Sequence, residues 1–88
     1  MYLFSDYLEA KDVVDQIIHT KKILPPFFCK IIKGEFDLKH QIIETSIDFK
    51  NCAFLDKVDL RYCECKQLVD FSNCIFEKEV DFGHAFDY

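Results

Sequence analysis

The chain has 88 residues, of which half are hydrophobic, and a formal net charge of −5. This length corresponds to one domain. Acids and bases balance in residues 1–35, so the whole excess of negative charge lies in residues 36–88. An acidic surface argues against direct binding to nucleic acid, because Lys and Arg supply the affinity for phosphate.

The first residues do not resemble a targeting signal. Met1 to Asp6 lack the basic region and the long apolar run of a signal peptide. No stretch approaches the roughly 18 apolar residues that a membrane span needs. Five cysteines without a secretory signal indicate a reducing compartment. We therefore expect a cytoplasmic protein that has no contact with a membrane.

Residues 6–22 have the pattern of an amphipathic helix. Ser5 or Asp6 can cap its start, and Glu9 follows Asp6 at capping-box spacing. Apolar residues recur at the spacing of one helix face, namely Leu8, Val13, Val14, Ile17 and Ile18. This helix would either cap an open end of the following structure or dock a partner.

The helix is predicted to end near Lys21 and Lys22, because positive charge is favourable at a helix C-terminus. Pro25-Pro26 then prevents any continuation, since Pro lacks an N–H donor and restricts the preceding residue. We expect residues 1–29 to form the helix and a linker, and residues 30–88 to form a second unit.

An 11-residue phrase dominates the rest of the chain. It opens as Phe36-Asp37-Leu38, Ile47-Asp48-Phe49, Val58-Asp59-Leu60, Val69-Asp70-Phe71 and Val80-Asp81-Phe82. A second inward pair follows at positions 6 and 8, as in Cys52/Phe54 and Cys74/Phe76. Spacings of two and three in alternation predict short strands joined by corners, which is a parallel β-helix. A helical 11-residue repeat is excluded, because residues i and i+2 do not share a helix face.

The repeat resembles that of pentapeptide-repeat proteins, in which Asp or Asn precedes a large Leu or Phe. Val69-Asp70-Phe71-Ser72-Asn73-Cys74-Ile75-Phe76 reads as two such units. The resemblance implies an all-β solenoid, a right-handed four-sided parallel β-helix, with 22 residues per coil because every second unit has a sixth residue. Fewer than three coils would follow an N-terminal α-helix that caps the solenoid. Phe49 would stack on Phe71, and Cys52 on Cys74.

The repeated aspartates are the main candidates for function. Asp37, Asp59 and Asp81 share one edge, and Asp48 and Asp70 share the opposite edge. They would either bond the backbone at corners or, with Glu77 and Glu79, form a partner-binding surface.

The resemblance also bears on function, because some pentapeptide-repeat proteins are similar to duplex DNA in shape and charge and bind DNA-handling enzymes such as gyrase. It implies a non-catalytic mimic or decoy that inhibits an enzyme acting on DNA or RNA. The alternative is a structural, dimerisation or scaffold module without such a partner.

The last phrase departs from the repeat. Ala85 fits position 6, but Asp87 stands at the apolar position 8. An uncovered end would leave backbone groups and apolar rings exposed. Either two subunits stack through Phe82, Phe86 and Tyr88, as the resemblance favours, or the chain is part of a longer rod.

Metal binding and catalysis are not expected. Cys63-Glu64-Cys65 lacks the spacing and the second pair of a zinc site, and the cysteines recur at a core position. A disulfide between Cys52 and Cys74 has a feasible Cα separation but poorly directed Cβ atoms. His40 and His84 share a corner position with Asn and Tyr, which indicates a role in the turn. We therefore predict no cofactor and no enzymatic activity.

Overall fold

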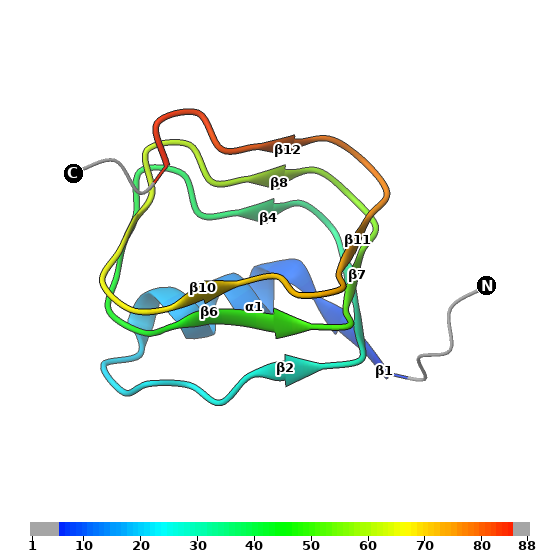
Figure 1. Cartoon of the computed structure of the whole chain (residues 1–88), viewed down its shortest axis with the longest axis horizontal. Coiled ribbons are helices and arrows are strands. Elements are labelled where there is room, and N and C mark those ends of the chain that lie inside the picture. The colour runs from blue at the N-terminus through cyan, green and yellow to red at the C-terminus, as the bar shows by residue number, and fades with distance from the viewer. Residues whose placement is uncertain (1–5, 86–88) are drawn as a thin grey trace.

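The computed structural model describes residues 6–85. The chain winds into stacked, four-sided coils in which short strands pair in parallel (Figure 1). The elements are β1 (Asp6–Glu9), α1 (Ala10–His19), β2 (Phe27–Phe28), β3 (Lys30–Lys33), β4 (Phe36–Asp37), β5 (Ile42–Ile43), β6 (Ile47–Lys50), β7 (Ala53–Phe54), β8 (Val58–Asp59), β9 (Glu64–Cys65), β10 (Val69–Asp70), β11 (Ile75–Phe76) and β12 (Val80–Asp81).

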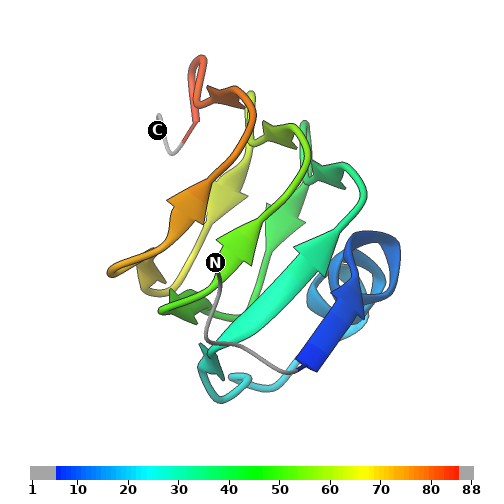
Figure 2. The ribbon, with the colours of Figure 1, turned by 90° about the vertical axis from the view of Figure 1, so that its right-hand side faces the viewer.

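Four stacks of strands form the sides of the solenoid. The β2 side contains β2, β6 and β10, the β3 side β1, β3, β7 and β11, the β4 side β4, β8 and β12, and the β5 side β5 and β9. Figure 2 shows the β3 side, whose four strands lie next to one another with α1 beyond the β1 edge. The parallel β-helix with one N-terminal helix is confirmed.

The register is 22 residues wherever one coil pairs with the next. Phe27 pairs with Phe49, Asp37 with Asp59, and Ile43 with Cys65. The 11-residue period therefore places two phrases in each coil, as the sequence predicts.

Ladders of side chains fill the interior. The ring of Phe49 stacks on Phe27 at 4.8 Å between centroids and on Phe71 at 5.8 Å. Phe54 stacks on Phe76 at 5.2 Å and meets Phe49 edge to face. Stacked rings bury much apolar surface and hold one register, because a slip by one residue would turn them outward.

The chain before α1 differs from the sequence prediction. Residues 6–9 form the strand β1, which pairs with β3 over its whole length, and not the first turn of the helix. Asp6 does not cap a helix; it accepts a hydrogen bond from Lys30 Nζ at 2.7 Å. The N-cap residue is Glu9, without a side-chain cap, and Ser5 lies outside the described residues. Pairing with a sheet edge has overridden the local helical pattern.

The helix covers part of the N-terminal end of the coil. Ala10, Val13 and Ile17 are buried, and the helix packs mainly against β4, with further contacts to β1 and β5. It ends at His19, before the predicted Lys21 and Lys22, and Thr20 is already extended. The helix therefore covers part of the first coil. Within residues 6–85, no helix has the length and apolar character that a membrane span requires.

The first coil begins earlier than the predicted boundary at residue 30. Directly after Pro25-Pro26, strand β2 pairs with β6 in the common register. Pro25 and Pro26 thus stand at positions 1 and 2 of a repeat that lacks the usual aliphatic residue and Asp. The segment expected to be a linker is partly the first side of the coil.

One corner in each repeat has a left-handed backbone. The φ angles lie between 53° and 62° at six residues spaced 11 apart, which are Cys29, His40, Asn51, Tyr62, Asn73 and His84. L-residues rarely adopt this conformation, and Asn tolerates it best among them. Position 5 of every repeat therefore has a physical role, since it provides the left-handed corner.

Candidate functional site

The aspartates at position 2 of the repeat stabilise corners. Asp37, Asp59, Asp70 and Asp81 each accept a hydrogen bond from the backbone N–H two residues later, at 2.8–3.2 Å. This geometry is an Asx-type turn, in which a short carboxylate replaces a backbone acceptor. The corner role considered from the sequence thus holds for these four residues.

Cations at position 4 neutralise the same carboxylates. Lys39 Nζ lies 2.8 Å from Asp37. Arg61 donates from Nε and Nη2 to the two oxygens of Asp59, at 2.9 and 2.8 Å. The Arg61 hydrogen bonds hold the pKa of Asp59 at about 2, below its ordinary value of 3.8. Repulsion between stacked carboxylates is therefore offset within each coil.

The opposite edge is arranged in the same way. Lys50 Nζ lies 2.9 Å from Asp48 and 2.9 Å from Asp70, so it bridges two coils. Hydrogen bonds from Ser72 and then from Lys50 lower the pKa of Asp70 to about 2. The pKa of Lys50 is raised by the same two carboxylates, Asp70 first.

The sequence-predicted binding residues differ in their accessibility. Asp59 is 2% exposed and Asp48 is 9% exposed, so neither can meet a partner directly. Asp37, Asp70 and Asp81 are partly buried and take part in the corner bonds just described. The glutamates Glu77 and Glu79 are exposed on the third coil.

The excess negative charge is spread around the solenoid. On each of the four sides, the outward positions carry one more acid than bases. The groups counted are Asp37, Asp59, Asp81, Lys39 and Arg61 on the β4 side; Asp48, Asp70 and Lys50 on the β2 side; Glu44, Glu64 and Lys66 on the β5 side; and Glu9, Glu77 and Lys33 on the β3 side. The surface is thus mildly negative on every side, without one dominant acidic face.

An aromatic stack follows one left-handed corner. The ring of Tyr62 lies between His40 and His84, at 4.9 and 5.0 Å between centroids. All three residues are exposed and have positive φ. The turn role predicted for the two histidines accounts for this arrangement.

The cysteines pack as core side chains. Cys52, Cys63 and Cys65 are buried, and none of the described cysteines is in a disulfide. Burial raises the pKa of Cys63 to about 12, which makes this thiol unreactive. A hydrogen bond with Cys74 lowers the pKa of Cys52, and the same contact raises the pKa of Cys74. Within residues 6–85, no cluster of three His, Cys, Asp or Glu side chains could hold a metal ion.

The third coil leaves an apolar end open. Leu60 is fully buried, whereas Phe82, at the same position one coil later, is 45% exposed. The same change from buried to partly exposed occurs at the other inward positions of the third coil, which are Val69, Phe71, Cys74, Phe76 and Val80. Phe82 thus lies at the surface where the sequence predicts a contact between subunits. Phe86 and Tyr88 lie outside the described residues.

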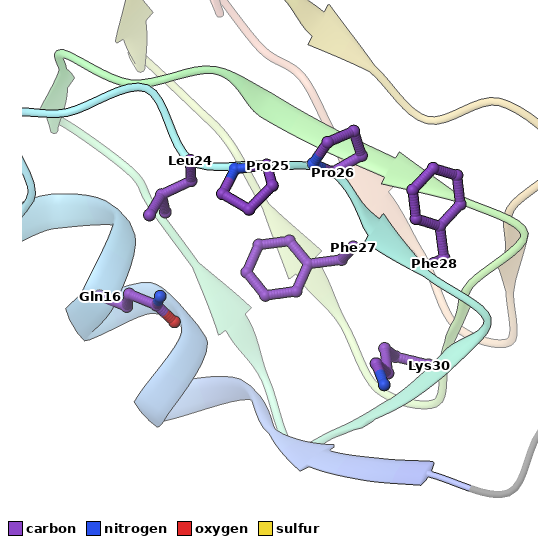
Figure 3. A pocket seen from close by; sticks show the side chains of 7 residues that line it. All are labelled: Gln16, Leu24, Pro25, Pro26, Phe27, Phe28 and Lys30. Carbon is purple, nitrogen blue, oxygen red and sulfur yellow. The ribbon is translucent and has the colours of Figure 1, made fainter.

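A pocket of about 360 Å³ opens at the other end of the solenoid, between β2 and α1 (Figure 3). Phe27, which is partly buried, points into the space between the two elements. The lining residues are Gln16, Leu24, Pro25, Pro26, Phe27, Phe28 and Lys30. This pocket could not be predicted from the sequence, because it depends on which part of the end the helix leaves uncovered.

The role of the cations as partners of the aspartates is not among the predictions from the sequence. Lys39, Lys50 and Arg61 recur 11 residues apart, two positions after an Asp. That periodicity indicates pairing between the cations and the aspartates, because positions 2 and 4 lie on the same outward face of an extended segment.

Comparison with protein families gives a match to part of the repeat region. A family model described as pentapeptide repeats (9 copies) matches residues 47–86, which cover the second coil and most of the third. The search of curated proteins and the search of solved structures found no match.

Proposed function

Because the chain belongs to the pentapeptide-repeat family, whose members are often protein-interaction modules, we propose that it is a non-catalytic protein that binds through the open end of its third coil. The observation that carries this proposal is the exposure of inward side chains. Phe82 is 45% exposed, whereas Leu60 in the second coil is fully buried. Apolar rings that are covered in one coil and uncovered in the next form a surface suited to a contact.

The occupant that we propose is a second copy of this chain. In the described sheets, β10, β11 and β12 each have a strand neighbour in the second coil only. These three edges lie on three sides of one ring. A partner that pairs with all three edge strands at once needs a coil of the same size, and a second copy of this chain has such a coil. A two-fold contact would cover the exposed aromatic rings and also provide hydrogen-bond partners for the backbone groups of the edge strands.

Sedimentation velocity tests this assembly. We expect the wild type to sediment as a dimer that dissociates on dilution, and Phe82→Asp to sediment as a monomer. Ile42→Asp is the matched control, because Ile42 is 58% exposed on the β5 side, away from the open end. A wild type that stays monomeric at high concentration would contradict the proposal, as would equal association of both variants.

A second candidate is a decoy that occupies the nucleic-acid groove of an enzyme acting on DNA or RNA. The observation that favours it is the charge distribution: each side of the solenoid keeps one acid in excess, so the rod is negative all around. A basic groove would attract such a rod in a salt-sensitive manner. Glu77 and Glu79 are accessible carboxylates of the third coil that would contribute to this attraction.

Pull-down at low and at high salt tests the decoy. We expect the wild type to retain a basic, nucleic-acid-binding protein at low salt and to release it at high salt. The double variant Glu77→Lys, Glu79→Lys should lose it, whereas Asp12→Lys on the exposed face of α1 should keep it. Retention that is indifferent to salt and to both changes would exclude this function.

A further inference from the structure

The rings of Phe27, Phe49 and Phe71 form one continuous stack inside the solenoid. The planes of neighbouring rings are nearly parallel, at 13° between Phe27 and Phe49 and 3° between Phe49 and Phe71. Their centroids are 4.8 and 5.8 Å apart, so each ring lies face to face with the ring of the next coil. The middle ring, Phe49, has a neighbour on both faces and is fully buried.

Phe27 is the last ring of this stack at the helix end of the solenoid. Its stacked partner is Phe49, and within residues 6–85 no ring lies against its other face. The Phe27 side chain is partly buried and points into the space between β2 and α1 (Figure 3). The pocket of about 360 Å³ lies in that space. One face of an aromatic ring is therefore available to a ligand in the pocket.

The other lining residues supply apolar walls and two polar groups. Leu24 and the two prolines are apolar, and the carboxamide of Gln16 points toward them (Figure 3). That carboxamide has no hydrogen-bond partner among the residues that the structure describes. The ammonium of Lys30 lies 2.7 Å from the Asp6 carboxylate, so its charge is already neutralised. An apolar pocket of this volume with one available amide has the character of a small-molecule site for an uncharged ligand.

We propose that this pocket binds a small, neutral, planar aromatic compound whose ring stacks on Phe27 and extends the stack of rings by one. Stacked aromatic pairs are stabilised beyond the area that they bury, which favours an aromatic ring over an aliphatic group of the same size. A hydroxyl group on the ring would bond to the Gln16 carboxamide, which both donates and accepts hydrogen bonds. This inference does not depend on the proposed function, which concerns the opposite end of the solenoid.

A chemical-shift titration of the isotope-labelled protein with phenol tests the site, and cyclohexanol is the saturated analogue of similar size. We expect phenol to shift the resonances of the Phe27 ring and of the Gln16 side-chain amide until they saturate. The dissociation constant of cyclohexanol should be about 2- to 10-fold higher, because it cannot stack. Shifts that do not saturate, equal affinity for the two compounds, or shifts confined to Phe71 and its neighbours would each overturn the proposal.

Two matched variants test the role of the Phe27 ring. Phe27→Leu keeps an apolar side chain but removes the ring, so it should bind phenol and cyclohexanol equally. Phe28→Leu is the control, because Phe28 also lines the pocket but is 52% exposed and has no ring contact within residues 6–85. This control should keep the preference for phenol. A preference that survives in Phe27→Leu, or that disappears in both variants, would contradict stacking on Phe27. If Phe27→Leu does not fold, the wild-type comparison of the two compounds remains decisive.

Discussion

Arg61 holds Asp59 by both carboxylate oxygens, at 2.9 and 2.8 Å, and its Nε also lies 3.6 Å from Asp81 in the next coil. One guanidinium thus interacts with the aspartates of two successive coils on the same side of the solenoid. The Asp59 side chain is only 3% exposed, whereas the Arg61 side chain is 40% exposed. Because Asp59 is buried and Arg61 is its one bidentate partner, we expect stability to be most sensitive to substitution at this contact of the aspartate ladder.

Arg61→Met should destabilise the fold by about 2 kcal/mol, because it removes both side-chain donors from a buried carboxylate and leaves it the backbone N–H of residue 61. Lys39→Met is the matched control at the same repeat position. Its ion pair with Asp37 is more exposed, and we expect a loss below about 1 kcal/mol. Urea unfolding of the three proteins measures both effects, and similar losses for the two variants would contradict the assigned role of burial.

Acid should unfold the protein partly through Asp59. Its pKa is about 2 in the folded protein, below the ordinary 3.8, so the folded state favours the ionised form. The stabilisation is complete above the ordinary value and is lost as the pH falls from 3.8 toward about 2. Unfolding midpoints measured across this window should fall for the wild type and less steeply for Asp59→Asn. An unchanged slope in the variant would assign the acid sensitivity to other groups, of which Asp70 has the same window.

The left-handed corner predicts opposite responses to two substitutions at Asn51, which is exposed and has a φ of 56°. Asn51→Gly should keep or slightly raise the stability, because Gly adopts positive φ without strain. Asn51→Val should lower it by about 1–2 kcal/mol, since a β-branched L-residue is disfavoured there. Thermal unfolding distinguishes them, and equal stability of the two variants would contradict a left-handed corner in solution.

The solenoid could be predicted from the sequence because its register follows from spacing alone. Phe49 and Phe71 stack as the 22-residue coil requires, and so do Phe54 and Phe76. Inward positions must stay apolar in every coil, so each repeat carries the same information again. The prediction of a core role for Cys52 succeeded for the same reason.

The N-terminal part was less predictable because its structure depends on pairing with another segment. Tyr7 and Leu8 fit a helix and a strand equally well by sequence, and the edge of β3 decides between them. The sequence predicts a linker at Phe27 because Pro25-Pro26 precedes it, although Pro is tolerated where a strand begins.

The function of the aspartates could not be read from their period. A repeated Asp is compatible both with hydrogen bonding to the backbone at a corner and with a charged binding surface. Which role it has depends on the groups that its side chain contacts. The structure places Asp59 against Arg61 and leaves Glu77 exposed, a distinction that requires the folded coil.

Amide hydrogen exchange at two protein concentrations tests directly whether the open end of the third coil is a binding surface for a second copy. We expect the amides of β10, β11 and β12 to exchange more slowly at high concentration than at low concentration. Amides of β6, β7 and β8, which lie between two neighbouring strands, should show no such difference. Third-coil amides that exchange at the same rate at both concentrations, in a protein that remains monomeric, would contradict the claim.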